Sequence, residues 1–139
     1  MALGFVPSKI HQGHMQGWEY KPVVAGTYTV GEALLWGSSD NANKLTVCTG
    51  ASLPVYISMA DVTIATAGDE IPCIKVDPEA LYDVPITTSV AAVALGTKVQ
   101  IASGGASINA TTTSSPHVEI VDKNGVGGAA NDIVTVRIS

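Results

Sequence analysis

Apolar and polar residues alternate with a period of two along several short stretches of the chain. In "DIVTVRIS", the side chains of Val134, Val136 and Ile138 point to one side of an extended backbone, and Thr135 and Arg137 point to the other. The stretches "PVYISMA", "TKVQIA" and "HVEIVD" show the same alternation, and "KLTVC" and "ALYDVPI" are further candidates. Stretches with a helical period are scarce. This pattern predicts about seven or more short strands and no helix longer than about three turns.

Several of the predicted strands follow a residue type that can reverse the chain. Gly31, Gly68, Gly96 and Asn131 each precede a strand-like stretch, and glycine and asparagine reach a positive φ at little steric cost. The unequal intervals between them exclude a solenoid repeat. Strands and turns of this kind predict an all-β fold, a small β-barrel or β-sandwich with short antiparallel strands.

The apolar phase of each strand predicts the core. Because a shift of one residue would move every side chain of a strand to the opposite face, this prediction also tests the phase. The predicted core residues are Leu45, Val47, Val55, Ile57, Ile74, Val76, Val99, Ile101, Val118, Ile120, Val134, Val136 and Ile138.

The first 25 residues have a different character from the rest of the chain. Pro7, Gly13, Gly17 and Pro22 interrupt any period there. The sequence therefore predicts an extended N-terminal arm over residues 1–25, with no regular element of its own. A single β-barrel domain over residues 26–139 follows the predicted arm.

Aromatic residues are concentrated near the N-terminus, and this suggests a role for the arm. Aromatic rings are poorly hydrated when free and dominate contact energies at interfaces. We therefore expect the arm to contact a neighbouring protein molecule rather than to fold back on its own domain. The expected contributors are Lys9, His11, His14, Trp18 and Tyr20.

Composition and charge exclude several classes of protein. A hydrophobic content of 46% with only 14% charged residues excludes an intrinsically disordered chain. The formal net charge of −5 argues against binding nucleic acid by neutralising its phosphates. The longest apolar run, "VAAVALG", is too short to span a membrane, and the N-terminal residues lack the pattern of a signal peptide. We expect a protein made in the cytoplasm that contacts neither nucleic acid nor membrane.

Residues with catalytic potential are few and poorly arranged. In an extended segment, the spacing of His11 and His14 points their rings to opposite sides, which disfavours a shared metal ion. Cys48 and Cys73 lack the glycine-rich or helix-start context that lowers a thiol pKa, so buried thiols are favoured over a disulfide or a nucleophile paired with His117. The loops "SGGAS" and "NGVGG" match no phosphate-binding spacing. The sequence predicts no catalytic residue, no metal site, no cofactor and no enzymatic activity.

Six short motifs follow one another in a definite order along residues 27–139. They are a "G-x-A-L" strand (Gly31 to Leu34), a strand beginning "p-x-x-i" (Pro54 to Ile57), "a-G-d-x-i-p" (Gly68 to Pro72), "G-x-k-V" (Gly96 to Val99), a threonine run (Thr111 to Thr113) and a final strand (Val134 to Arg137). This order resembles that of the capsid cement, or head-decoration, proteins of tailed bacteriophages. The chain departs from the family pattern at "AAND", where the family usually has Ala-Gly-Asp, although Asn131 can still make the turn.

The resemblance implies a function without catalysis. Members of that family are generally small β-barrels, often trimers, that bind the outer surface of the assembled head and hold neighbouring capsomers together. The expected partner is then the major capsid protein, and the expected location is the outer surface of the capsid. A small β-sandwich module of a virion that binds a carbohydrate or a receptor is the alternative. Sugar sites usually stack sugars on aromatic rings, and after Trp36 only Tyr56 and Tyr82 remain.

Overall fold

The computed structural model describes residues 4–9 and 17–139, so His11 and His14 lie outside the described residues. The described part contains twelve strands and one short 3-10 helix, η2 (Ser39–Asn41), which confirms the prediction of many short strands. The strands are β1 (Val6–Lys9), β2 (Trp18–Pro22), β3 (Gly26–Tyr28), β4 (Ala33–Trp36), β5 (Leu45–Val47), β6 (Tyr56–Ser58), β7 (Val62–Ile64), β8 (Glu70–Lys75), β9 (Leu81–Pro85), β10 (Lys98–Val99), β11 (Val118–Asp122) and β12 (Ile133–Ile138).

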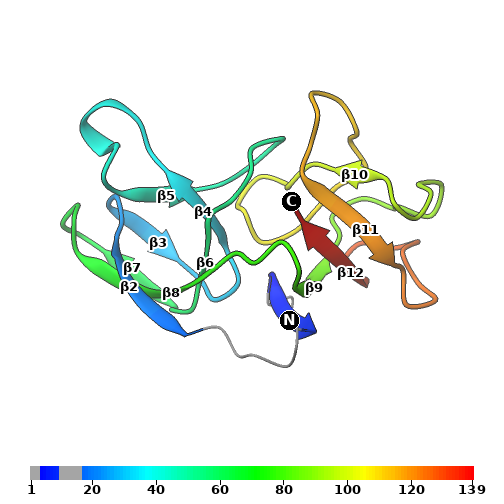
Figure 1. Cartoon of the computed structure of the whole chain (residues 1–139), viewed down its shortest axis with the longest axis horizontal. Coiled ribbons are helices and arrows are strands. Elements are labelled where there is room, and N and C mark those ends of the chain that lie inside the picture. Colours follow the sequence, from blue (N-terminus) through cyan, green and yellow to red (C-terminus); the bar gives the residue numbers. More distant parts are fainter. Residues whose placement is uncertain (1–3, 10–16) are drawn as a thin grey trace.

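The strands form three antiparallel sheets. The C-terminal sheet has the order β1-β9-β12-β11-β10, the middle sheet has the order β2-β8-β6-β4-β5, and β3 pairs with β7. Figure 1 shows the C-terminal sheet in one half of the molecule, and the middle sheet with the β3–β7 pair in the other. The sheets do not close into a barrel. Of the two predicted all-β folds, the structure therefore has the β-sandwich-like one. No helix of the described residues is long and apolar enough to cross a membrane.

The middle sheet is buried on both of its faces, as strand β6 shows. Ile57 belongs to a large apolar cluster that also contains Tyr82 from the C-terminal sheet. The preceding residue, Tyr56, belongs to a smaller cluster with Tyr28 and Ile64 from the β3–β7 pair. Ser58 is buried too. The alternation in the sequence correctly places Ile57 and Tyr56 on opposite sides of the strand. Both sides are buried, because the C-terminal sheet covers one face of β6 and the β3–β7 pair covers the other.

The strand phases predicted from the sequence are confirmed. Ten of the thirteen predicted core residues are buried, and Val47, Val55 and Val76 are partly buried and pack against the two clusters. The predicted turns are confirmed as well. Gly31, Gly68, Gly96 and Asn131 all have a positive φ, of 92°, 100°, 87° and 70°. Local alternation and turn chemistry therefore suffice to predict most elements outside the first 25 residues.

The prediction that residues 1–25 contain no regular element is wrong for two segments, and so is the expectation that this arm does not fold back on its own domain. Strand β1 pairs with β9 at one edge of the C-terminal sheet, and β2 pairs with β8 at one edge of the middle sheet. Pro7 and Pro22 are compatible with these strands because an edge strand needs ladder hydrogen bonds on one side only. Proline indicated an irregular segment in the sequence, whereas here it marks two sheet edges.

The start of the described chain is anchored in the large cluster by Phe5. This side chain is fully buried, and its backbone N–H donates a 2.9 Å hydrogen bond to the carbonyl of Gly31. Gly4 has a φ of 77°, and a Cβ at this position would overlap the backbone of Gly31. The segment before β1 therefore needs glycine for both its conformation and its close approach to the turn at Gly31.

We expect Phe5→Ala to destabilise the protein by about 3–5 kcal/mol, because truncation of a buried phenylalanine loses its burial and leaves a cavity. Chemical denaturation followed by circular dichroism measures the change. Leu95→Ala is the matched control, since Leu95 is 60% exposed and its truncation should be close to neutral. Equal stability of the two variants would contradict the role of Phe5 as an anchor.

Candidate functional site

The two cysteines are inert in their positions in the fold. Both are free and fully buried. Burial raises the pKa of the Cys48 thiol to about 12. For Cys73, burial and the nearby Glu19 carboxylate raise the pKa to about 11. The thiolate, which is the nucleophile and the metal ligand, is therefore disfavoured at both positions.

The structure does not bring His117 together with either thiol in a catalytic arrangement. Nδ1 of His117 lies 2.8 Å from the backbone carbonyl oxygen of Ser139. The Cys48 and Cys73 thiols instead donate to the backbone carbonyls of Ser52 and Ile71. Within residues 4–9 and 17–139, no group of three or more histidine, cysteine or acidic side chains is placed to hold a metal ion. His11 and His14 are not among these residues.

Glu32 is the one buried carboxylate of the described chain. Its Oε1 atom accepts hydrogen bonds from the Thr29 hydroxyl (2.8 Å) and from the Thr29 backbone N–H (3.2 Å). Its Oε2 atom is buried without a hydrogen-bond partner. Burial is the main cause that raises the pKa of Glu32, and the Thr29 bonds partly oppose it. The Glu32 carboxylate thus holds the turn between β3 and β4 through its bonds to Thr29, while its burial disfavours the charged form.

The most prominent exposed feature is on β2. Trp18 and Tyr20 are 62% and 63% exposed, more than the other large hydrophobic side chains of the described residues. Their cross-strand partners on β8 are Ile74 and Pro72, so both rings share the face of the sheet that carries Ile74 and the large cluster. The rings extend that apolar face to the rim of the sheet, where they meet solvent.

The opposite face of β2 carries a polar and aromatic group. Glu19 and Lys21 form an ion pair of 3.3 Å, and the Tyr56 hydroxyl donates a 3.3 Å hydrogen bond to Glu19. Lys21 Nζ lies 5.5 Å from the Tyr56 ring centroid, and Trp36 meets the same ring edge to face at 6.1 Å. Hydrogen bonding to Glu19 is the main cause that raises the pKa of Lys21. The ion pair therefore fixes two charges of opposite sign, two residues apart, on an exposed strand.

The outer backbone edge of β2 carries polar groups that pair with no strand of the described residues. The Val23 N–H donates to Asp69, on the β8 side, whereas the Val24 N–H donates to Leu45 on the other side. The N–H and C=O groups of successive residues point to alternate sides of a strand. The backbone groups of Trp18, Tyr20 and Pro22 therefore point to the same side as those of Val24, away from β8. Among the described residues, no strand pairs with β2 on this side. We call Trp18, Tyr20 and Pro22, with these outward backbone groups, the outer edge of β2.

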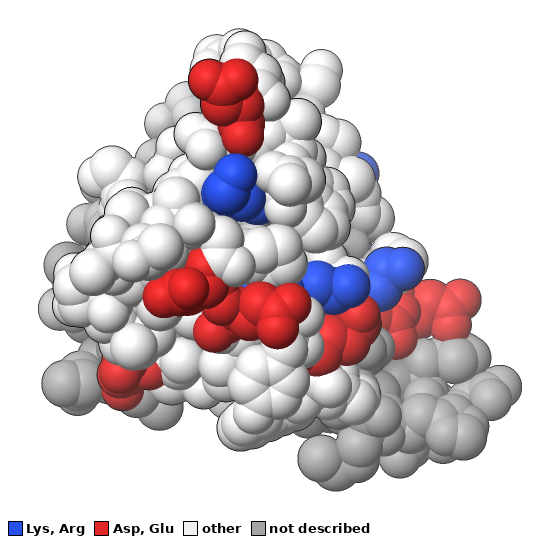
Figure 2. Space-filling model, turned by 90° about the vertical axis from the view of Figure 1, so that its left-hand side faces the viewer, with Lys and Arg blue, Asp and Glu red and all other residues white. Residues whose placement is uncertain are grey.

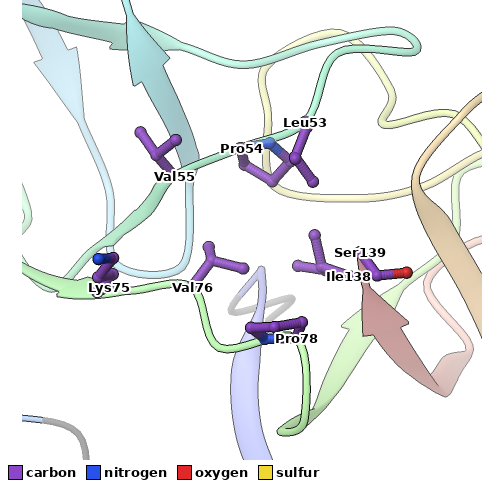
Figure 3. A pocket seen from close by; sticks show the side chains of 8 residues that line it. All are labelled: Leu53, Pro54, Val55, Lys75, Val76, Pro78, Ile138 and Ser139. Atoms are coloured by element: carbon purple, nitrogen blue, oxygen red, sulfur yellow. The ribbon is translucent and has the colours of Figure 1, made fainter.

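An apolar groove lies where the C-terminal sheet meets the loops beside β6 and β8. It has a volume of about 310 Å³ and is lined by Leu53, Pro54, Val55, Lys75, Val76, Pro78, Ile138 and Ser139. In Figure 3, Leu53 and Pro54 lie on one side, Val76 and Pro78 on the other, and Ile138 reaches the groove from the end of β12. Leu53 is 44% exposed at its rim. With so few polar atoms, the groove suits an apolar contact and not a charged small molecule.

Charge is mixed on the face nearest the middle sheet. Figure 2 shows acidic and basic side chains next to one another on this face, with uncharged surface around them. The Lys21–Glu19 ion pair on β2 is a contact between opposite charges of the same kind. A basic patch of the kind that binds nucleic acid is not visible on this face, in agreement with a net charge of −5.

The structure places only part of the predicted contact surface. Trp18 and Tyr20 are together on one exposed face, and Lys9 is the last residue of β1, where its backbone pairs with Leu81 on a different sheet. His11 and His14 lie outside the described residues. The groove and the outer edge of β2 were not predicted, because each depends on segments far apart in the sequence. A proline after an aromatic alternation, as in "WEYKP", is the signal that could have indicated an edge strand.

Comparison with known proteins gives no assignment for this chain, since no protein-family model and no curated protein sequence matches it.

We expect the pH dependence of stability to change in Glu32→Gln. Because the pKa of Glu32 is raised in the folded state, the folded protein binds more protons at this residue than the unfolded protein does. The contribution of Glu32 to the free energy of unfolding is therefore complete below its unfolded-state pKa and is lost as the pH rises through its folded-state pKa. Glutamine has no such titration. Denaturation midpoints across the acid range should therefore show a gain for the variant, relative to the natural protein, that grows toward neutral pH. A constant difference at every pH would contradict this.

Neither thiol should react with an alkylating reagent in the folded protein. The raised pKa and full burial of Cys48 and Cys73 both suppress the reactive thiolate. Mass spectrometry after alkylation should detect two modifications in denaturant and none in native buffer. Rapid modification of one cysteine in native buffer would show that the structure around that thiol opens readily.

Proposed function

We propose that this protein is a decoration, or cement, protein of a tailed-bacteriophage head. In this role it binds the major capsid protein on the outer surface of the assembled head and stabilises the contacts between capsomers. It is made in the host cytoplasm and acts on the virion, without catalysis, cofactor, nucleic acid or membrane.

The agreement between motif positions and structural elements is the observation that supports the proposal most. Gly31, Gly68 and Gly96 of the decoration-protein motifs are positive-φ turn residues, and each stands directly before or near a strand. The segments from Pro54 to Ile57 and from Val134 to Arg137 fall on β6 and β12 or on their borders. The motif residues thus lie on turns and strands of this fold, as the resemblance requires.

The exposed surface is consistent with contact to a large protein partner. Trp18 and Tyr20 are exposed aromatic side chains of the type that dominates interface energies. The groove beside Leu53 offers a second apolar surface. Both features can contribute to a contact with a capsid subunit or with an adjacent copy of the chain, as expected for the aromatic residues of this segment.

A carbohydrate- or receptor-binding module remains the second candidate, and one observation favours it. Trp36 is 41% exposed and lies against Tyr56, with Lys21 and Glu19 beside the rings. An exposed indole with polar groups at its edge is a surface on which a sugar ring can stack. Binding on a glycan array that is lost in Trp36→Ala, with head binding absent, would favour this candidate over decoration.

We expect heads that lack this protein to assemble normally but to lose resistance to heat, pressure or chelators. A protein that binds only the assembled shell stabilises that state by mass action. The measurement is thermal disruption of heads with and without added purified protein. Heads whose resistance is the same in both cases would count heavily against the cement role.

The contribution of β2 to head binding can be tested with Trp18→Ala. This side chain is mostly exposed, so the variant should fold and bind heads more weakly. Deletion of Met1 to Gly17 is a poorer test, because it also removes β1 and the buried Phe5. If Trp18→Ala decorates heads normally, the contact surface lies elsewhere, with the groove at Leu53 as the first alternative.

A further inference from the structure

The outer edge of β2 is suited to pair with itself. It has outward N–H and C=O groups at Trp18 and Tyr20, but only a C=O at Pro22. Short exposed edges of this kind are templates for the addition of a strand. From this geometry we propose that two copies of the chain associate through antiparallel pairing of their β2 strands, around a two-fold axis that passes through the Tyr20 pair.

The hydrogen bonds of this arrangement follow from its register. Tyr20 lies opposite Tyr20 of the second copy, and the two residues exchange both of their N–H···O=C bonds. At each end, the Trp18 N–H donates to the Pro22 carbonyl of the other copy. The Trp18 carbonyl is then the single outward group in each copy without a strand partner, because Pro22 has no N–H. The pairing joins the two middle sheets into one continuous sheet.

Charge selects this register over the nearest alternative. With Tyr20 on the two-fold axis, Glu19 of each copy lies directly opposite Lys21 of the other. A register with Glu19 on the axis forms as many backbone bonds, but it places the two Glu19 carboxylates opposite each other. Opposite charges stabilise a directly facing pair and like charges destabilise it. Lys21 and Glu19 already form an ion pair within one copy, so two copies would join into a ring of four alternating charges.

The other face of the pairing is aromatic and apolar. Trp18 and Tyr20 share one face of β2, so the two Tyr20 rings would be neighbours across the axis, and each Trp18 would face Pro22 of the other copy. Aromatic cross-strand pairs stabilise antiparallel sheets. This contact would cover the two most exposed large hydrophobic side chains of the described residues.

The length of the edge fits the proposed pairing. β2 begins at Trp18, directly after Gly17, and the outer edge ends where the Val24 N–H already donates to Leu45. In the proposed register, Trp18 to Pro22 of one copy lie opposite Pro22 to Trp18 of the other. The paired segment is thus the whole of β2, and it ends just before the position at which Leu45 of β5 occupies this side.

A second copy explains these features better than a strand from another protein. A foreign strand would have to supply its own complementary charges and tolerate the missing N–H at Pro22, whereas a second β2 meets both conditions by symmetry. The result is a dimer, in contrast to the trimer that the resemblance implies. The inference does not depend on the proposed function, because it concerns the free protein in solution.

Sedimentation velocity of the purified chain, without heads, tests the charge pairing. The natural protein should dimerise, and Glu19→Lys and Lys21→Glu should each be monomeric, because each places like charges opposite one another. An equimolar mixture of the two variants should restore the dimer, since every facing pair is again opposite in sign. A monomeric natural protein, a trimer, or a mixture that stays monomeric would overturn the proposal.

Cysteine cross-linking tests the register. An equimolar mixture of Glu19→Cys and Lys21→Cys should form a disulfide-linked heterodimer under mild oxidation, because residues 19 and 21 face each other in a non-hydrogen-bonded pair, where Cα atoms are about 4.5 Å apart and Cβ atoms are closest. Glu19→Cys alone is the matched control and should not cross-link, since residue 19 faces residue 21. The natural cysteines are buried and should not interfere. Cross-linking of Glu19→Cys alone, or no cross-linking in the mixture, would reject the register.

Discussion

The fold depends on a sheet that is buried on both faces. Strand β6 lies between two apolar clusters, with Ile57 in one and Tyr56 in the other. The C-terminal sheet packs on one side of the middle sheet and the β3–β7 pair covers the other. The large cluster is built mostly from the C-terminal part of the chain, and Ala33, Ile57 and Ile74 contribute to it from the middle sheet. The middle sheet therefore links the two apolar clusters, and it also carries the β2 edge and part of the groove.

The alternation of apolar residues and the residue types at turns were sufficient to predict the strand phases and several turns of this protein. Val134, Val136 and Ile138 are buried as their alternation indicated, and Gly68 and Asn131 make positive-φ turns as their residue types indicated. These features depend on the backbone and on immediate neighbours, so a single sequence contains them. The absence of any local context for a reactive thiol likewise anticipated two buried cysteines.

The remaining features depend on pairing between distant segments, which alternation does not encode. The partner of β1 is more than seventy residues away along the chain, and the groove combines segments from three separate places. Proline was also misleading. Pro22 breaks the pattern of an interior strand, yet it stands on a sheet edge that no other strand of the described residues covers. The contact role predicted for Trp18 and Tyr20 stays a prediction, and their exposed arrangement along one edge strand became evident only with the fold.

The pairing of β1 has a consequence for how the chain folds during synthesis. Residues 6–9 pair with residues 81–85, which in turn pair with residues 133–136. Strand β1 is therefore synthesised well before β9 and β12, and its sheet can form only after both have been made. Folds dominated by such distant contacts are slow to form and expose apolar strands meanwhile. The short length of β1 and its proline, Pro7, make this strand a poor template for pairing with other chains during that delay.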